Sequence, residues 1–288
     1  MANKNEENYI NIEDNINENE IEKPGKKLSA YRNISYSKRD IFYRKSKEEG
    51  FRARSVYKLK EIHYNYNILS SSSSKFVDLC AAPGSWTQML RILTKSNKNA
   101  KIVSVDIQDI VPIEGVNIIK GDITRQDTIE KILSNFNDEK IDVVIFDGAP
   151  DVTGLIDVDM YMQVELIIFA LVIVMKLLKK GGIFVAKMFK VGAVDDMKEI
   201  IRDNLYAVKS DFSVKILFDN VFYFKPSSSR ASSHETYLIC ENFDIKDEEV
   251  LKVIEKATME EIFNYEEKIK DEKTRNFLEF LVKGAYSL

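Results

Sequence analysis

The sequence predicts an α/β protein whose mostly parallel sheet of seven strands is covered by helices on both faces. Two observations predict this fold. Short apolar segments of the strand type alternate with longer segments of the helix type over most of the chain. The last two strand candidates have only a loop between them, so one edge strand is expected to be antiparallel.

The two ends of the chain differ in composition from its centre. The chain has 288 residues, of which 44% are hydrophobic and 31% are charged, and this suits one large soluble domain with flanking extensions. Residues 1–35 are rich in Asn, Glu, Ile and Lys and are predicted to be disordered. Residues 36–243 hold the alternating pattern, and residues 244–288 are predicted to form a charged helical extension.

Each element follows from a local pattern. Two helical patterns, separated at Gly50, occupy residues 36–70 ahead of the first strand. The motif KKGG at Lys179–Gly182 is typical of a helix end with a glycine stop. The apolar run Leu166–Met175 is too short to cross a bilayer and is predicted to be buried helix. Strands are predicted at Phe76–Cys80, Ile102–Asp106, Asn117–Ile119, Val143–Phe146, Ile183–Phe189, Val214–Phe218 and Glu235–Cys240. Further helices are predicted at Trp86–Leu93, Gln126–Asn135, Asp159–Leu178 and Asp195–Ala207.

The net charge of -4 conceals a basic segment. Residues 26–60 contain twelve Lys and Arg residues and three acids, whereas residues 1–25 contain seven acids and two lysines. A local basic stripe inside a net-acidic protein indicates a site for a polyanion. The alternative is a solvated basic helix that binds nothing.

The cysteines and histidines exclude other kinds of site. Cys80 and Cys240 lie in apolar runs and are predicted to be buried thiols in a reducing compartment, which favours a cytoplasmic protein. His63 and His234 are far apart, and the sequence holds no cluster of metal ligands, so no metal site is predicted. The polar, acidic N-terminus is unlike a secretory signal, and no membrane association is predicted.

The residues that follow the predicted strands indicate a ligand. The first strand ends in DLCAAPGSW, where small residues let a ligand approach the backbone. The second ends in Asp106, the position of the acid that binds ribose hydroxyls in dinucleotide folds. Asp122 follows the third strand and Asp147 the fourth. A single acid at a strand end is often only a helix cap. Residues suited to a ligand follow four successive predicted strands, and this favours an adenosine ligand. The chain lacks GxGxxG and a P-loop lysine, so a ligand without phosphates is favoured, and S-adenosylmethionine fits.

Two lysines lie in apolar or helical surroundings where lysine is unexpected. Lys187 interrupts the strand GIFVAKMF, and Lys58 lies in RSVYKLK within the basic helix. A buried lysine needs a carboxylate partner or a lowered pKa. Asp147 ends the neighbouring strand and Glu235 begins the last one. These four side chains are therefore expected to converge at the ligand end of the sheet.

Six segments together resemble the FtsJ family of RNA ribose 2'-O-methyltransferases over about residues 36–243. They are RARSVYKL, DLCAAPGSW, GDIT, DGAPDVTG, GGIFVAKMF and KPSSSRASSHE, in chain order. The segment DGAPDVTG followed by DVDMYMQ is most similar to the eukaryotic branch that methylates the tRNA anticodon loop at nucleotides 32 and 34. The resemblance implies a Rossmann-like class I methyltransferase fold that uses S-adenosylmethionine and releases S-adenosylhomocysteine.

The resemblance also implies roles for individual residues. It implies a catalytic tetrad of Lys58, Asp147, Lys187 and Glu235, in which Lys187 is the general base that takes the proton of the ribose 2'-hydroxyl. It places the methyl donor against Ala82, Pro83, Gly84, Trp86, Asp106, Asp122 and Asp147.

A third group of residues suits contacts with RNA phosphates. Arg52, Arg54 and Lys60 belong to the basic segment, and Arg230 lies in a serine-rich loop near the last strand. Arg52 and Arg54 precede the strand turn, so they are not expected to affect donor binding. Their alternative role is to form surface ion pairs with Glu48 and Glu49, about one turn earlier.

The favoured function is methylation of the tRNA anticodon loop, with tRNA as the partner. Auxiliary protein subunits are expected as further partners; they would select the methylated nucleotide and bind residues 244–288. A second function keeps the chemistry and changes the RNA to ribosomal RNA or an mRNA cap. A third is a non-catalytic RNA-binding or scaffold protein on the same fold. The intact tetrad argues against the third, because an inactive protein need not keep two lysines in such surroundings.

Overall fold

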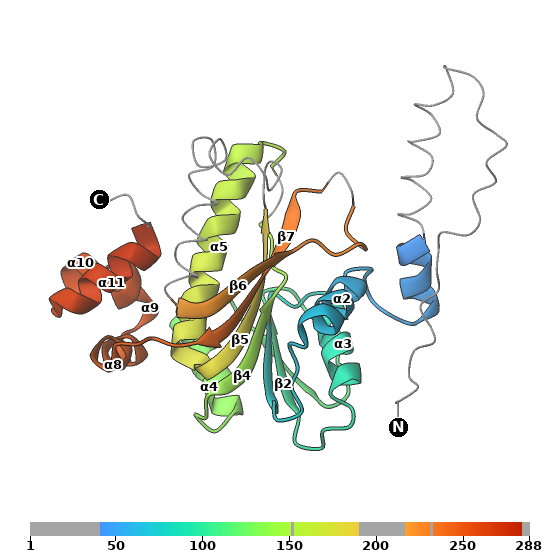
Figure 1. Ribbon diagram of the computed structural model, residues 1–288, viewed down its shortest axis with the longest axis horizontal. Helices are drawn as coiled ribbons and strands as arrows, with labels where there is room; N and C mark the ends of the chain where they lie inside the picture. The colour runs from blue at the N-terminus through green and yellow to red at the C-terminus, as the bar shows by residue number, and fades with distance from the viewer. Residues whose placement is uncertain (1–40, 151–152, 190–216, 231–232, 284–288) are drawn as a thin grey trace, which may run out of the picture. The chain divides into compact units, whose positions relative to one another are not determined.

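The central element of the structure is a sheet of seven strands (Figure 1). The structure is a computed structural model and describes residues 41–150, 153–189, 217–230 and 233–283. The strand order is β3-β2-β1-β4-β5-β7-β6, and the seven strands match the predicted number. The strands are β1 (Lys75–Leu79), β2 (Lys101–Asp106), β3 (Val116–Lys120), β4 (Ile141–Phe146), β5 (Leu178–Phe189), β6 (Phe218–Phe224) and β7 (Glu235–Phe243).

The sheet is mostly parallel, and its antiparallel pairing lies at one edge, which confirms the predicted architecture. Strands β1 to β5 pair in parallel with their neighbours. Strand β7 runs antiparallel to both β5 and β6. The carboxyl ends of β1, β2, β3 and β4 therefore meet at one edge of the sheet, where ligands of parallel sheets bind.

The position of β6 differs from the prediction. The predicted strand Val214–Phe218 lies outside the described residues except for its last two positions, and the observed strand is Phe218–Phe224. Most of β6 falls in a stretch that was expected to be loop. The segment VFYF has the aromatic and β-branched residues that suit a strand. Asp219 and Asn220 are exposed, which an edge strand permits.

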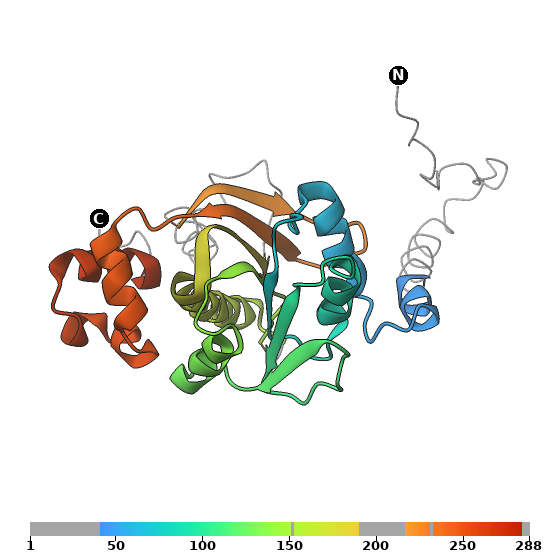
Figure 2. The same ribbon diagram turned by 90° about the horizontal axis from the view of Figure 1, so that it is seen from below.

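Helices cover both faces of the sheet (Figures 1 and 2). The helices α2 (Val56–Tyr66) and α3 (Ser85–Leu93) pack on one face, in a core that includes Phe76, Trp86 and Tyr237. The helices α4 (Gln126–Asn135) and α5 (Ile156–Leu177) pack on the other. Residues 41–48 are also helical, so the two helical patterns separated at Gly50 are confirmed for the described residues. The predicted helix Asp195–Ala207 lies outside the described residues.

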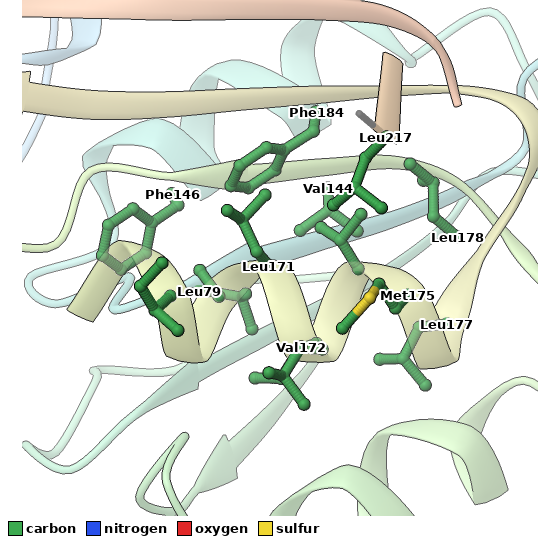
Figure 3. Packing of buried hydrophobic residues seen from close by; sticks show 14 of the residues in the cluster. Leu79, Val144, Phe146, Leu171, Val172, Met175, Leu177, Leu178, Phe184 and Leu217 are labelled. Carbon is green, nitrogen blue, oxygen red and sulfur yellow. The ribbon is translucent and has the colours of Figure 1, made fainter. Parts of the chain in front are cut away.

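Helix α5 is the most apolar helix of the sheet region (Figure 3). Its residues Leu171, Val172 and Met175 are completely buried in the core cluster that also contains Phe146 of β4 and Phe184 of β5, and Leu171 points toward the two phenylalanines. This confirms the prediction that the apolar run is buried helix. None of the helices in the described part of the chain is long and apolar enough to cross a membrane.

The motif KKGG does not end helix α5. The helix ends at Leu177, and Leu178 already belongs to β5. The ladder between β4 and β5 pairs Ile141 with Leu178 and then Val143 with Ile183, so residues 179–182 bulge out of the sheet. Gly181 has a φ of 76°, a conformation that favours glycine. The glycines therefore shape the start of the strand.

The C-terminal extension is helical and packs on the sheet domain. It contains α8 (Glu248–Lys256), α9 (Met259–Phe263), α10 (Tyr265–Lys268) and α11 (Glu272–Lys283). Its side chains Val250, Ile254 and Ile262 are buried in the same core as α5. The rings of Phe169 and Phe263 lie 4.3 Å apart, centroid to centroid. Residues 248–283 are thus bound by apolar contacts, so the chain needs this segment to complete its core.

The buried Lys176 joins α5 to the end of α8. Only 6% of Lys176 is exposed, and its Nζ donates hydrogen bonds to the carbonyl oxygens of Ile254 (2.9 Å) and Ala257. We expect Lys176→Met to lower the free energy of unfolding by about 2–3 kcal/mol, because buried carbonyls at the helix end lose their donor. Urea unfolding measures the change. The exposed Lys252→Met on α8 is the control and should change stability by less than about 0.5 kcal/mol. Equal stability of the two variants would contradict this prediction.

Candidate active site

A cavity of about 610 Å³ opens at the carboxyl ends of the parallel strands. Four strand ends contribute to it through Ala82, Asp106, Asp122 and Asp147. The remaining wall comes from α5 and from the segments that follow β2 and β4, and includes Ile107, Gly148, Pro150, Tyr161, Met162, Leu166 and Phe169. Four carboxylates, those of Asp106, Asp122, Asp147 and Glu165, lie beside apolar and aromatic side chains in the lining. This lining suits a ligand that carries hydroxyl groups, a flat ring and a positive charge.

Asp106 shapes the turn after β1. Its Oδ2 accepts a hydrogen bond from the amide of Ala82 (2.8 Å), and its Oδ1 accepts one from the amide of Gln108 (2.7 Å). Only 8% of Asp106 is exposed. Cys80 has a φ of 55°, so the chain reverses sharply at the end of the strand. The carboxylate therefore fixes the small-residue turn at the cavity.

Arg52 binds the outer side of the same turn. Its guanidinium donates to the carbonyl oxygen of Pro83 (2.9 Å) and to that of Pro112 (3.1 Å). Gly84 has a φ of 102°, and a Cβ there would lie 2.6 Å from Arg52 Nη1. Arg52 was not expected to affect donor binding because it precedes the turn in sequence. The structure places its guanidinium on the turn, a contact between distant segments that the sequence did not indicate.

Trp86 lies behind the turn and does not line the cavity, although it was expected to form a pocket wall. It is 2% exposed, and its Nε1 donates to the carbonyl oxygen of Ser55 (2.9 Å). Its ring lies 5.5 Å from that of Tyr237. Trp86 thus fastens the start of α2 to α3, and its influence on the cavity is indirect.

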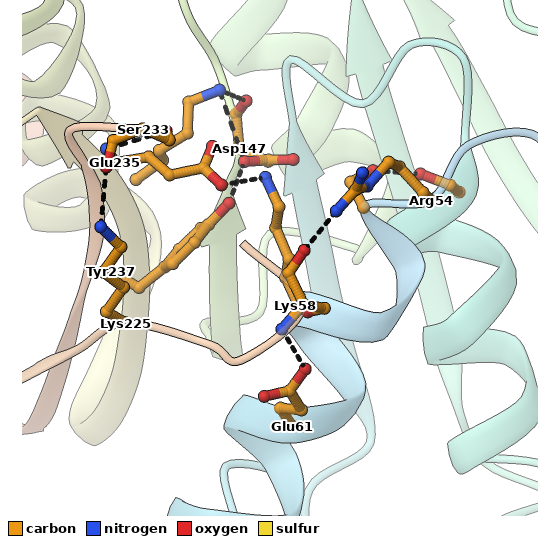
Figure 4. Close-up of polar contacts among 12 residues, drawn as sticks. Arg54, Lys58, Glu61, Asp147, Lys225, Ser233, Glu235 and Tyr237 are labelled. Atoms are coloured by element: carbon orange, nitrogen blue, oxygen red, sulfur yellow. Dashed lines mark hydrogen bonds and ion pairs between the residues drawn. The ribbon is translucent and has the colours of Figure 1, made fainter. Parts of the chain in front are cut away.

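Four charged side chains meet beside the cavity as two ion pairs (Figure 4). Lys58 Nζ lies 2.6 Å from Glu235 Oε1. Lys187 Nζ lies 3.5 Å from Asp147 Oδ1 and donates to the carbonyl oxygen of Asp147 (2.8 Å). All four side chains are between 12% and 18% exposed. Asp147 belongs to both groups, because it also lines the cavity. A hydroxyl that reaches Lys187 is therefore next to whatever the cavity holds.

Tyr237 is a site residue that sequence reasoning missed. It is completely buried, and its hydroxyl donates to Asp147 Oδ1 (2.8 Å). Burial, with Asp147 and Glu235 nearby, raises the pKa of Tyr237 well above its ordinary value, so the phenol stays a neutral donor. Tyr237 follows Glu235 by two positions in β7, and side chains two apart share one face of a strand. That spacing was the available signal.

Glu235 remains ionised in spite of its partial burial. Burial acts to raise the pKa of Glu235, but the charge and hydrogen bond of Lys58 outweigh it and the pKa is lowered. Asp78, under the turn, behaves in the opposite way: burial raises its pKa to about 8, and the Thr87 hydroxyl (2.6 Å) opposes this only in part. Asp78 is therefore a neutral acid below about pH 8, while Glu235 carries a charge.

Gln163 is a second residue that the sequence did not single out. It is 1% exposed, and its Nε2 donates to the carbonyl oxygens of Lys187 (2.9 Å) and Gly148 (3.2 Å). Helix α5 thereby holds the backbone of β5 at Lys187 and the segment after β4 at a fixed separation. The motif DVDMYMQ contains this glutamine.

The predicted phosphate contacts lie in different surroundings. Arg54 Nη2 donates to the carbonyl oxygen of Ser228 (2.5 Å), and Lys60 Nζ lies 5.9 Å from the ring centroid of Tyr64. Arg230 is exposed. Glu49, the expected ion-pair partner of the arginines, accepts the hydroxyl of Tyr57 (3.0 Å) and lies near Lys45.

Comparison with known proteins identifies related chains. Residues 51–243 match the FtsJ-like methyltransferase family. A Dictyostelium discoideum protein assigned as a tRNA (cytidine(32)/guanosine(34)-2'-O)-methyltransferase is 48% identical over 212 residues, which are 73% of each chain. The Schizosaccharomyces pombe tRNA (cytidine(32)/guanosine(34)-2'-O)-methyltransferase is 42% identical over 218 residues, covering 73% of this chain and 72% of the relative. A crystal structure from Plasmodium falciparum, of a protein assigned as a ribosomal RNA methyltransferase, is 29% identical with a TM-score of 0.55 and covers 67% of this chain and 98% of that one.

Proposed function

The chain belongs to the FtsJ-like methyltransferase family, and we propose that it methylates ribose 2'-hydroxyls in the anticodon loop of tRNA, at nucleotides 32 and 34. One observation supports the proposal most directly: Asp147 pairs with Lys187 and also lines the carboxylate-lined cavity, so the expected base lies beside the expected donor site. The proposal includes cytoplasmic action and auxiliary protein subunits that bind the C-terminal extension and select the nucleotide.

The cavity fits S-adenosylmethionine as the methyl donor. Asp106 would accept hydrogen bonds from the ribose hydroxyls, and Asp122 would face the adenine edge. Ala82 lines the cavity and would lie against the methionine end, where a small side chain leaves the backbone accessible. Pro83 and Gly84, which were also expected to contact the donor, do not line the cavity and would shape the turn that presents Ala82. When bound, the donor supplies a methyl group on a positively charged sulfur. The carboxylates of the cavity suit this charge.

Lys187 would act as the general base. In its neutral form, its Nζ takes the proton of the 2'-hydroxyl while the ribose oxygen bonds to the methyl carbon and the carbon–sulfur bond breaks. On one side, Lys187 Nζ lies 3.5 Å from Asp147 Oδ1. The Tyr237 hydroxyl donates to the same Asp147 oxygen (2.8 Å) and so holds the carboxylate beside Lys187. The Lys58–Glu235 pair keeps a second cation next to the site. Positioning of the ribose oxygen supplies much of the rate.

The relatives favour tRNA over ribosomal RNA. Two relatives named as tRNA methyltransferases are 48% and 42% identical. Two archaeal relatives named as ribosomal RNA large subunit methyltransferase E, from Methanosarcina acetivorans and Methanothrix thermoacetophila, are 38% and 40% identical, so sequence identity favours tRNA by a small margin. Methylation of ribosomal RNA or of an mRNA cap is the second candidate. The third, a non-catalytic RNA-binding or scaffold protein, requires that the chain bind RNA without methyl transfer.

A transfer assay tests these functions. The purified chain, S-adenosylmethionine with a labelled methyl group, and tRNA should give label in tRNA, and 2'-deoxy substitution at nucleotides 32 and 34 should abolish it. Mapping of 2'-O-methyl marks in cells depleted of the chain checks the target among all RNAs. Loss of marks from ribosomal RNA alone would favour the second candidate. Donor binding without any transfer would favour the third.

Lys60 and Arg52 are expected to affect different ligands. We expect Lys60→Ala to weaken tRNA binding and to flatten the slope of log affinity against log salt by about 0.7, because one phosphate contact is lost.

Arg52→Ala should instead weaken donor binding several-fold, since Pro83 and Pro112 lose their hydrogen-bond donor. Filter binding at several salt concentrations and calorimetry measure the two effects. Donor affinity that is unchanged in Arg52→Ala, with a flattened salt slope, would return Arg52 to the role of a phosphate contact.

A further inference from the structure

The loop between β6 and β7 delivers Glu235 to the site. We call residues 225–234 the serine loop; its described residues are 225–230 and 233–234. Glu235 is the first residue of β7 and pairs with Phe189 of β5, so the loop meets the sheet at the residue whose carboxylate binds Lys58. Within the loop, Lys225 Nζ donates to the carbonyl oxygen of Ser233 (2.7 Å), and the amide of Glu235 donates to Ser233 Oγ (3.2 Å). These contacts join the two ends of the loop but do not attach it to the rest of the protein.

Helix α2 provides that attachment through Glu61 (Figure 4). Glu61 Oε2 accepts the amide of Ser227 (2.6 Å), and Glu61 Oε1 accepts the amide of Ser228 (3.0 Å). One carboxylate thus binds two consecutive backbone amides, and such bonds are about twice as strong as neutral ones. Ser228 is completely buried by this arrangement.

Helix α2 and the residues just before it contact the loop and Glu235 at three points. Lys58 and Glu61 are three residues apart in α2 and so lie on one side of it, and Arg54 lies two residues before the helix begins. Arg54 donates to the carbonyl oxygen of Ser228, and Lys58 pairs with Glu235. Glu61 therefore binds the loop seven residues ahead of Glu235, and Lys58 binds Glu235 itself. The spacing between these two attachment points fixes the Lys58–Glu235 pair.

An acid at this place is unfavourable for RNA binding. Residues 26–60 carry twelve Lys and Arg residues, and Glu61 follows directly after them. A carboxylate there repels phosphates, so RNA binding alone does not account for it. Its two amide contacts provide a structural reason.

We propose that Glu61 is a positioning residue that fixes the serine loop and so holds Glu235 against Lys58 beside the base Lys187. This inference rests on the proposed methyl transfer and adds to it a residue outside the tetrad. A shift of about 1 Å in a catalytic group is enough to cost about a hundredfold in rate.

The test compares Glu61→Ala and Glu61→Gln with wild type in the full-length chain, with S-adenosylmethionine and saturating tRNA. At a temperature where all proteins are folded, Glu61→Ala should lower kcat about tenfold to a hundredfold while the donor Kd stays within about twofold. Glu61→Gln keeps one acceptor oxygen and should recover part of kcat. The control Glu130→Ala removes a carboxylate that accepts one exposed bond, from Gln126 on α4, and should keep the wild-type kcat.

Amide hydrogen exchange gives a second measurement that does not need turnover. Residues 225–235 should exchange about tenfold faster in Glu61→Ala, while β1 and β2 should exchange as in wild type. If wild type methylates tRNA and folded Glu61→Ala has the same kcat, this inference is overturned while the proposed function stands. A wild type that methylates no RNA would overturn the proposed function, and this inference with it. If Glu61→Ala does not fold, Glu61→Gln decides: unchanged kcat overturns the inference, and kcat lowered at least about threefold supports it.

Discussion

Replacing Lys187 with alanine is expected to lower the rate of methyl transfer by about a hundredfold to ten-thousandfold, the usual contribution of a general base. The 2'-hydroxyl must lose its proton as its oxygen attacks, and in the described part of the chain Lys187 is the basic group held at Asp147, next to the cavity. Alanine removes the amine and leaves the cavity lining intact, because Lys187 does not line it. The donor Kd should therefore remain within about twofold of the wild-type value.

Single-turnover transfer to tRNA and calorimetric donor titration measure the two quantities. Lys180→Ala is a matched control on the same strand, since the Lys180 side chain is 80% exposed and pairs with Asp244, far from the tetrad along β5. It should retain wild-type transfer. Substantial turnover by Lys187→Ala would remove Lys187 as the base, and Lys58 would become the next candidate.

The sheet and the meeting of the strand ends could be predicted from the sequence. Buried parallel strands are short apolar runs, and their carboxyl ends must lie at one edge whatever the details of packing. Asp106, Asp122 and Asp147 therefore reach one cavity, because each lies at the end of such a run or within two residues after it. Strand β6 escaped prediction because an edge strand tolerates Asp219 and Asn220, which look like loop residues in the sequence.

Contacts between segments far apart in sequence could not be predicted. Arg52 binds carbonyl oxygens of Pro83 and Pro112, and no local pattern indicates such partners. The Trp86 indole N–H donates to the carbonyl oxygen of Ser55, so Trp86 packs toward the start of α2. A helical sequence pattern does not predict which neighbouring element a side chain contacts. In the sequence Glu61 is one charged residue among several in a helix, and no local pattern predicts that its carboxylate binds the amides of two loop residues.

Replacing Asp106 with alanine is expected to raise the donor Kd about a hundredfold, which corresponds to about 3 kcal/mol. Two causes contribute. The amides of Ala82 and Gln108 lose the carboxylate that they share, so the turn at the cavity loosens. The donor also loses the acceptor for its ribose hydroxyls. Methyl transfer at saturating donor should fall much less than donor affinity. Within the described residues the Asp106 carboxylate bonds to the Ala82 and Gln108 amides, and Lys187 bonds to Asp147.

Asp106→Asn separates the two causes. Asparagine keeps one carbonyl oxygen for the Ala82 amide and loses the charge and the second acceptor. If Asp106 acts only by binding the Ala82 amide, the asparagine variant should bind the donor nearly as wild type does. If Asp106 binds the ribose directly, its Kd should lie between those of wild type and Asp106→Ala. Asp109→Ala is the control, because Asp109 is 85% exposed and pairs with Lys120 away from the cavity lining. Calorimetry that gives a wild-type Kd for Asp106→Ala would place the donor away from the end of β2, and the ribose would then need another acceptor among the strand ends.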